Sequence, residues 1–253
     1  MPLTLATVPC LTDNYAFLAH DAETGATACI DVPDAAPILA ELAARGWRLT
    51  DILITHHHDD HIQGVAALVA ATGAKVTGHA ADAHRLPPLD RAVRPGDTVA
   101  IGGAGGRVIA VPGHTTGHVA YLFPGLAFTA DSLMAAGCGR LFEGTAEQMH
   151  AAFAAFEALP DETLICSGHE YTASNLRFAL TLEPDNPALV SRASETAEAR
   201  AAGRPTVPST LGLERATNPY LRVHTPELAA AVGLAGAAPA AVFAAVRAAK
   251  DRF

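Results

Sequence analysis

Short apolar runs rich in β-branched residues, each bounded by Gly, Pro, Asp or Asn, fill the first two thirds of the chain. Nine of them have the length and composition of strands: TLATV, NYAFLAHD, TACIDV, LTDILIT, KVTG, RVIAVPG, HVAYLF, LAFTA and TLICSG. Between these runs, residues 34–45, 61–72 and 145–159 place apolar side chains at helical spacing, and the last stretch opens with a Thr145-x-x-Gln148 capping box. The pattern predicts an α/β protein in which packed sheets are covered by outer helices.

The pattern changes near residue 171, where the strand-like runs stop and helix signals begin. One helical stretch starts at Ser174, a second at Asn186 with proline at its first helical position, and a third at Thr225, again followed by proline. An alanine-rich segment of high helix propensity then runs to Phe253. We therefore predict two domains, of which the second is α-helical: residues 1–172 and 173–253.

Composition places the chain among ordinary globular proteins, since 50% of its 253 residues are hydrophobic and 17% are charged. Its formal net charge of -9 argues against a nucleic-acid or anionic-membrane surface, because such surfaces need clustered Lys and Arg to displace counterions. The four cysteines show no C-x-x-C spacing and are interpreted as reduced thiols. The N-terminus has no basic segment before an apolar one, and no apolar run approaches about eighteen residues, so we expect a cytoplasmic location. We also expect a monomer.

The segment THHHDDH, residues 55–61, carries four histidines and two aspartates directly after an apolar strand-like run. Burying unpaired polar or charged groups costs several kcal/mol, so a metal ion is the simplest common partner for these side chains. His56 and His58 are two positions apart and point the same way in an extended segment, whereas His57 points the opposite way. The segment therefore predicts a metal site with His56 and His58 on one ion.

Further candidate ligands lie at the ends of other apolar runs. Asp60 and His61 can serve a second ion if the chain turns into a helix at His61. His114 follows a run that ends in Pro-Gly, Asp131 follows the run LAFTA, and His169 follows a run that ends in Ser-Gly. Nitrogen and carboxylate donors together suit zinc, manganese or iron and do not separate the three metals. A single ion with spare histidines is the alternative.

Other titratable residues near these segments receive a plainer interpretation. Asp59 is interpreted as a carboxylate that is solvated or lies beside the ligands, with no assigned role. The remaining histidines are expected to be surface or hydrogen-bonded residues: His20, His57, His79, His84, His118, His150 and His224.

T-H-x-H-x-D-H, followed by P-G-H-T-x-G-H, an aspartate at a strand end and G-H-E-Y, together resemble the metallo-β-lactamase superfamily. Within it, the chain resembles the glyoxalase II (hydroxyacylglutathione hydrolase) family from LTDNY near its start to AVRAAKDRF at its end. The segments AGCGRLFEGT, GHEYT and VRAAKD carry this narrower likeness. The resemblance implies a four-layer αββα sandwich over residues 1–172, followed by a smaller helical substrate-binding domain over residues 173–253.

The resemblance also implies a thioester hydrolase with two divalent metal ions per chain, zinc first, with iron or manganese as alternatives. By position it assigns His56, His58 and His114 to one ion, Asp60, His61 and His169 to the other, and Asp131 to a place between them. Asp60 and Asp131 are the implied catalytic carboxylates. A water held between the ions, with its pKa lowered towards ~7, would attack the thioester carbonyl as hydroxide. The expected substrate is S-D-lactoylglutathione, which is hydrolysed in the second step of methylglyoxal detoxification.

Glutathione carries two carboxylates, so an acidic protein needs local cations to bind it. The resemblance offers a substrate-binding set: Arg140, Phe142, Tyr171, Arg247 and Lys250. Arg247 and Lys250 are three positions apart on a predicted helix and share a face, although an ordinary solvated basic patch is the alternative. Phe142 stands where the family commonly has a tyrosine, so one hydroxyl donor is missing and weaker affinity is expected.

Four other functions stay open on the sequence. A glutathione persulfide dioxygenase, which is an iron oxidoreductase of related fold, and other hydrolases of the superfamily share the histidine motif. The full second set of ligands and the long helical region count against the dioxygenase. A metallo-nuclease needs a basic face, against which the net charge argues. A non-catalytic metal-binding protein would keep the ligands without hydrolysing thioesters.

Overall fold

The computed structural model describes residues 3–253, which separate into two compact units. The first unit comprises the chain up to residue 110 together with 117–130, and the second comprises 111–116 together with 131–253. No helix within the described residues is both long enough and apolar enough to cross a membrane.

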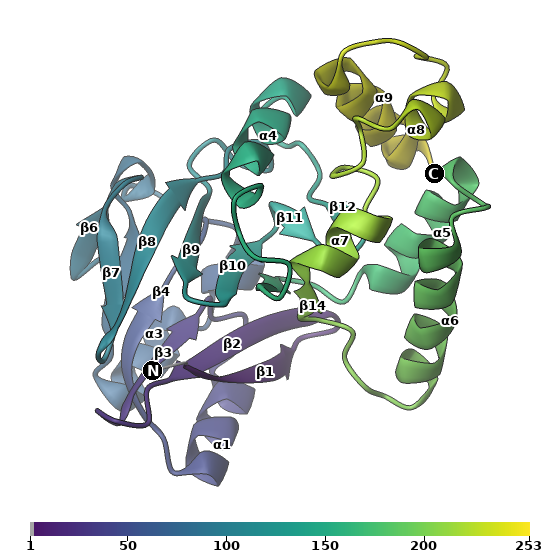
Figure 1. Cartoon of the computed structure of the whole chain (residues 1–253). Coiled ribbons are helices and arrows are strands. Elements are labelled where there is room, and N and C mark those ends of the chain that lie inside the picture. Colours follow the sequence, from purple (N-terminus) through teal and green to yellow (C-terminus); the bar gives the residue numbers. More distant parts are fainter. Residues whose placement is uncertain (1–2) are drawn as a thin grey trace. The chain divides into compact units, whose positions relative to one another are not determined.

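The first unit contains a six-stranded sheet with its strands in the order of the sequence (Figure 1). These strands are β1 (Thr4–Cys10), β2 (Asn14–His20), β3 (Ala26–Ile30), β4 (Arg48–Leu53), β5 (Lys75–His79) and β6 (Arg91–Val93). The first three strands pair antiparallel, whereas β3 to β6 pair parallel. Carboxyl ends of parallel strands meet at one edge of a sheet, and Ile30 at the end of β3 pairs with Leu53 at the end of β4. Asp31 and the THHHDDH segment therefore begin at the same edge.

Helices α1 (Ala35–Arg45) and α3 (Val65–Thr72) pack their apolar side chains on this sheet and complete its core. Asp34 begins α1, as the sequence pattern predicted, because its side chain accepts a hydrogen bond from the amide of Ala36. The helix residues that are most deeply buried against the strands are Ile38, Leu42, Val65 and Leu68.

The single helix predicted over residues 61–72 is instead two helices, α2 (Asp59–Ile62) and α3. The interruption lies at Gly64, where a Cβ atom would be 2.8 Å from Cγ1 of Val32 and 2.9 Å from the carbonyl oxygen of the same residue. Only glycine permits this close approach, and the backbone departs from helical continuity to make it. The first helix also begins at Asp59, two residues before the position that the sequence suggested.

An antiparallel meander completes the first unit. It consists of β7 (Thr98–Ile101), β8 (Ala104–Ala110), β9 (Val119–Phe123) and β10 (Leu126–Ala130). The meander contacts the sheet of β1 to β6 through polar groups as well as apolar ones. The buried hydroxyl of Tyr121 donates to the carbonyl of Ile54 over 2.7 Å, and the amide of Val119 donates to the carbonyl of Thr55 over 3.0 Å. The meander thus fixes the backbone from which the histidine segment starts.

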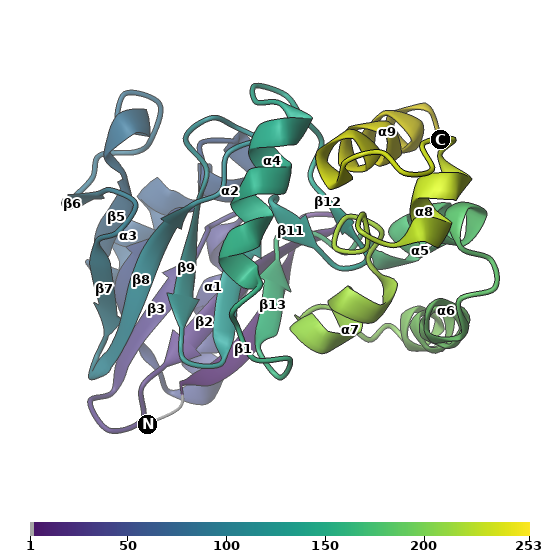
Figure 2. The ribbon, with the colours of Figure 1, turned by 45° about the horizontal axis from the view of Figure 1, so that its top comes forward.

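The second unit is mainly helical (Figure 2). Its helices are α4 (Ala146–Phe153), α5 (Thr172–Leu182), α6 (Pro187–Ala201), α7 (Leu211–Thr217), α8 (Pro226–Ala231) and α9 (Pro239–Arg252), and its short strands are β11 (Leu133–Met134), β12 (Gly137–Cys138), β13 (Leu164–Ser167) and β14 (Ser209–Thr210). The expectation that strands stop near residue 171 was wrong for β14, in which Ser209 pairs with Ile165 of β13. This strand consists of two polar residues, Ser209 and Thr210, so the sequence shows no apolar run there.

Helix starts in the second unit follow the predicted capping residues closely. Thr145 and Gln148 form both hydrogen bonds of a capping box at α4. The Asn186 side chain accepts from two amides at the start of α6, and the Thr225 hydroxyl accepts from the Leu228 amide at α8. Local sequence was therefore sufficient to predict these helix starts.

A buried polar network attaches the helices to the β11–β12 hairpin. The carboxylate of Glu214 accepts from the guanidinium of Arg192 over 2.5 Å and from the amide of Ala136 over 2.8 Å. The Asn218 side chain donates to the carbonyls of Met134 and Gly137, both over 2.9 Å. Because a buried charge without partners costs several kcal/mol, this paired arrangement specifies where the hairpin lies. The hairpin directly follows Asp131.

Candidate metal centre

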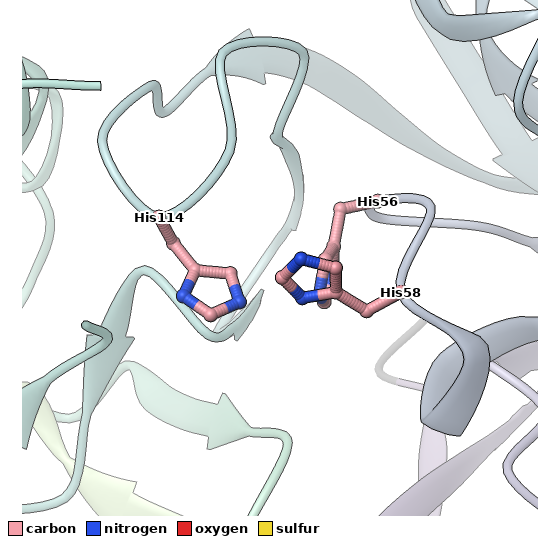
Figure 3. A group of neighbouring side chains, drawn as sticks. All are labelled: His56, His58 and His114. Atoms are coloured by element: carbon pink, nitrogen blue, oxygen red, sulfur yellow. The ribbon is translucent and has the colours of Figure 1, made fainter. Parts of the chain in front are cut away.

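His56 and His58 extend from the loop after β4 with their rings close together (Figure 3). Nε2 of His56 lies 3.1 Å from Nδ1 of His58. The segment is extended up to His58, which caps α2, so alternate side chains point the same way. The structure therefore brings the two predicted partners of the first unit together.

Asp31 organises the ligand candidates of this unit, and sequence analysis missed it. Its carboxylate accepts from the Thr55 amide over 2.8 Å, from the Thr55 hydroxyl over 2.7 Å and from Nδ1 of His61 over 2.8 Å. The hydroxyl has a single proton, so its oxygen is the acceptor for Nδ1 of His56, 3.0 Å away. Both imidazoles consequently carry the proton on Nδ1 and the lone pair on Nε2. Asp31 follows the apolar run TACI, which is the signal that could have identified it.

Asp31, His56 and His61 also place one donor atom each within 4.8 Å of one another. The hydrogen bonds to Asp31 nevertheless occupy its carboxylate with N–H and O–H donors, which gives it an orienting function. Asp60 is half-buried, and a side-chain amide orients it. Asn14 donates to the Asp60 carboxylate over 2.9 Å and to the Asp60 carbonyl over 3.1 Å.

The other two histidines of this region lie outside the ligand groups. His57 faces Arg85 and Asp82, with its Nε2 3.2 Å from the guanidinium and its Nδ1 3.7 Å from the carboxylate. His118 is buried and stacks on the ring of His56, with centroids 4.6 Å apart and planes at 12°. His118 was expected only to be a surface or hydrogen-bonded residue, so its contact with His56 is information that the sequence did not supply.

The second unit provides three of the predicted ligands. Nδ1 of His114, drawn in Figure 3, donates to the carbonyl of Arg140 over 2.7 Å, which leaves the lone pair on Nε2. Oδ2 of Asp131 lies 3.4 Å from Nε2 of His114 and 3.3 Å from Nε2 of His169. All three side chains are buried. One carboxylate oxygen therefore faces two imidazoles, each from a different predicted ligand set.

The contact between His114 and Asp131 pairs acceptor with acceptor. With its Nδ1 proton donated to the Arg140 carbonyl, a neutral His114 presents a lone pair at Nε2, and the carboxylate oxygen presents only lone pairs, so a cation or a proton has to lie between them. Buried histidine nitrogens around a carboxylate oxygen fit a divalent metal with nitrogen and oxygen ligands. The residues present thus match the group that the resemblance implies, without separating zinc, iron and manganese.

Gly139 is required for this geometry. A Cβ atom at this position would be 1.8 Å from the carbonyl oxygen of Asp131 and 3.1 Å from Nδ1 of His114. The Gly139 amide donates to the carbonyl of Ser132 over 3.1 Å. Any side chain here would displace the backbone that presents both Asp131 and the carbonyl of Arg140.

The residues predicted to bind substrate differ strongly in exposure. Phe142 is 61% exposed and contacts the ring of His114 edge-on, with centroids 5.3 Å apart. Tyr171 is 40% exposed and stacks on His169, with centroids 4.7 Å apart and planes at 8°. The Arg140 side chain is also largely exposed. These three therefore have surface available to a ligand.

Arg247 and Lys250, the two α9 residues predicted to bind substrate, differ in burial and in hydrogen-bond partners. Arg247 is buried, and its guanidinium donates to the Cys138 carbonyl over 3.0 Å and to Asp251 over 2.8 Å. Lys250 is half-buried and donates to the carbonyl of Ser174 over 3.1 Å. Burial and the neighbouring guanidinium of Arg247 lower the pKa of Lys250 to about 8.

All four cysteines are buried and lie outside any disulfide. Burial raises the pKa of Cys10 and of Cys138 to about 11. Because the thiolate is the nucleophilic form of cysteine, these two thiols are unsuited to covalent catalysis at neutral pH.

Comparison with protein families matches nearly the whole chain in two parts. The metallo-beta-lactamase superfamily matches residues 21–169, and the family described as hydroxyacylglutathione hydrolase C-terminus matches residues 170–253. A relative from Jannaschia sp. (strain CCS1), named hydroxyacylglutathione hydrolase, is 65% identical over 251 residues, which cover 98% of each chain.

Two solved structures have the same fold. BLEG-1 B3 metallo-beta-lactamase is 20% identical, with a TM-score of 0.66 over 86% of this chain and 99% of that chain. TTHA1623, solved in a di-iron-bound form, is 25% identical, with a TM-score of 0.62 over 86% of this chain and 100% of that chain.

Proposed function

The chain belongs to the hydroxyacylglutathione hydrolase family of the metallo-β-lactamase superfamily, and on that premise we propose that it hydrolyses S-D-lactoylglutathione to D-lactate and glutathione. Its fold is that of the superfamily, followed by a helical C-terminal domain, so the fold expected from the resemblance is confirmed. The match over residues 170–253 carries the assignment to a glutathione thioester, because the histidine motif alone is shared by many hydrolases.

Two divalent ions are proposed per chain, in the two ligand sets that the resemblance implies. The sets are His56, His58 and His114 for one ion and Asp60, His61 and His169 for the other, with Asp131 shared. The position of one Asp131 oxygen beside a histidine of each set supports this proposal, as does the di-iron form of a structural relative. When bound, such ions lower the pKa of water towards ~7 and polarise a carbonyl oxygen.

The chain's own residues have two tasks in this chemistry. Asp31 and Thr55 keep the Nε2 lone pairs of two candidate ligands available, and the carbonyl of Arg140 does the same for His114. Asp60 and Asp131 supply the negative charge that keeps divalent ions in the site. Glutathione leaves as a thiolate, which is a good leaving group, so a strong general acid is unnecessary.

Substrate binding is proposed to rest on the five residues that the resemblance indicated. Arg140 and Lys250 offer cationic groups to the carboxylates of glutathione, and Arg247 adds positive charge from its buried position. Phe142 and Tyr171 offer exposed ring surface next to candidate metal ligands. In this proposal all metal ligands lie before residue 172, and two of the three substrate-binding cations, Arg247 and Lys250, lie after it.

A cytoplasmic monomer remains part of the proposal. Four buried thiols outside any disulfide are typical of a reducing compartment, and a chain of this size does not need disulfides for stability.

The decisive experiment compares substrates on one metal-analysed preparation. S-D-lactoylglutathione should be hydrolysed at least a hundredfold more efficiently than a β-lactam or a lactone, and glutathione persulfide should not be oxidised. Metal content of about two ions per chain should accompany full activity. Efficient persulfide oxidation, or a metal-replete protein without thioesterase activity, would overturn the proposal.

A further inference from the structure

Helix α9 carries an aspartate, Asp251, in its last turn, where the helix dipole disfavours a negative charge. Asp251 is the next-to-last residue of this helix, and the C-terminal end of a helix has partial negative charge. A carboxylate there gains nothing from the helix itself. Its compensation has to come from the groups that its side chain contacts.

Those groups are two arginines of very different exposure. Oδ1 of Asp251 accepts a hydrogen bond from Nη2 of Arg247 over 2.8 Å and lies 3.8 Å from Nε of Arg140. The Arg247 side chain is 7% exposed, whereas that of Arg140 is 63% exposed. One carboxylate oxygen thus stands between a buried guanidinium and an exposed one.

The buried guanidinium is held firmly. Nη1 of Arg247 donates to the carbonyl of Cys138 over 3.0 Å, and the guanidinium lies over the Tyr220 ring, 5.6 Å from its centroid. An anchored Arg247 keeps Asp251 in one place. Asp251 in turn limits the directions that the long, exposed side chain of Arg140 adopts.

We propose that Asp251 is a positioning residue that, anchored by the buried Arg247, holds the exposed Arg140 in place to bind a carboxylate of the glutathione moiety. The inference rests on the proposed function and deepens it. The three groups together carry one net positive charge, so they still attract an anion. Without Asp251, two like charges repel each other, and Arg140 must be ordered by the substrate at the cost of its side-chain entropy.

Steady-state kinetics and direct binding test this role together. Asp251→Asn should raise KM for S-D-lactoylglutathione roughly three- to tenfold, with kcat changed less than about twofold, because uniform binding is lost. Binding of S-hexylglutathione, a thioether that cannot be hydrolysed, should weaken by the same factor in calorimetry. Asp251→Glu should recover part of the affinity. KM for S-lactoyl-N-acetylcysteamine, which lacks the tripeptide, should stay unchanged.

Asp185→Asn is the matched control, since it makes the same charge change at an exposed aspartate of the same unit and should leave every parameter unchanged. In an Arg140→Ala background, the effect of Asp251→Asn should shrink to less than half. The inference is overturned if Asp251→Asn leaves the affinity for S-hexylglutathione unaltered or improves it, or if it raises KM equally for both thioesters. It is also overturned if the effects of Asp251→Asn and Arg140→Ala are additive. Absent binding of S-hexylglutathione to the wild type would also overturn it. Turnover by the wild type tests the proposed function separately.

Discussion

Nδ1 of His61 donates a hydrogen bond to Oδ2 of Asp31 over 2.8 Å, and both side chains are buried. The same oxygen accepts from Thr55, whose hydroxyl is the partner of His56. One carboxylate therefore sets the tautomer of two histidines that belong to different proposed ligand sets. The two sets are linked through it before any ion is considered.

Asp31→Asn should lower the affinity of both metal positions by about 10- to 100-fold, because the amide cannot accept all three hydrogen bonds. The measurement is the metal content of the protein after dialysis against increasing concentrations of a chelator. Asp59→Asn is the matched control, since it makes the same change at an exposed aspartate of the histidine segment and should leave metal content unchanged. Loss of only one of the two ions in Asp31→Asn would contradict the linkage.

Asp131→Ala should lower the occupancy of both metal positions together and abolish most activity, because one carboxylate oxygen faces His114 and His169 at similar distances. Metal analysis by mass spectrometry and thioester hydrolysis are measured on the same sample. A variant that kept one full equivalent of metal and near-normal turnover would show that the carboxylate is not shared.

His57→Ala should leave metal content nearly intact, whereas His56→Ala and His58→Ala should deplete it. The reason is the direction of the His57 ring, which faces Arg85 and Asp82. Metal stoichiometry of the three purified variants is the readout, with thermal unfolding as a check on folding. Equal metal loss in all three would refute the alternation of side chains in this segment.

Affinity for glutathione conjugates should fall as pH rises through about 8, because burial and nearby cations lower the pKa of Lys250 to that value. Below pH about 7 the ammonium is charged and binds a carboxylate; above pH about 9 the neutral amine does not. Calorimetric titration with S-hexylglutathione from about pH 6 to about pH 9.5, in steps of about half a unit, is the measurement.

Lys250→Arg is the matched variant for this titration, since a guanidinium stays protonated over the whole range. Its affinity should be independent of pH above about 7, apart from the contribution of the ligand's own ammonium, which wild-type and variant protein share. An alkaline loss of affinity that is the same in both proteins would assign the titration to another group.

Phe142→Tyr should strengthen binding of S-D-lactoylglutathione by on the order of 1 kcal/mol, or about fivefold in KM, if the added hydroxyl donates to the tripeptide. The position is 61% exposed, so the hydroxyl meets no steric barrier to solvent. Phe142→Leu, which keeps an apolar side chain without a ring, is the comparison. An unchanged or higher KM in Phe142→Tyr would remove this position from the tripeptide contacts.

Local sequence was sufficient for the elements that depend on nearby residues. The capping residues Thr145, Asn186 and Thr225 begin α4, α6 and α8 as predicted, because a cap satisfies amides within three positions of itself. The spacing of His56 and His58 likewise placed their rings together, since side chains alternate along an extended backbone. The motif order then identified the superfamily.

Partners distant in sequence were decided by the tertiary structure. Asp31 meets His61 because β3 and β4 are parallel neighbours that end at the same edge, and the buried guanidinium of Arg247 meets the Cys138 carbonyl 109 positions earlier in the chain. Residue spacing fixes which side chains share a strand or helix face. Which face is covered, which nitrogen of a histidine keeps its lone pair, and which cation stays exposed depend on contacts between segments that sequence separation does not encode.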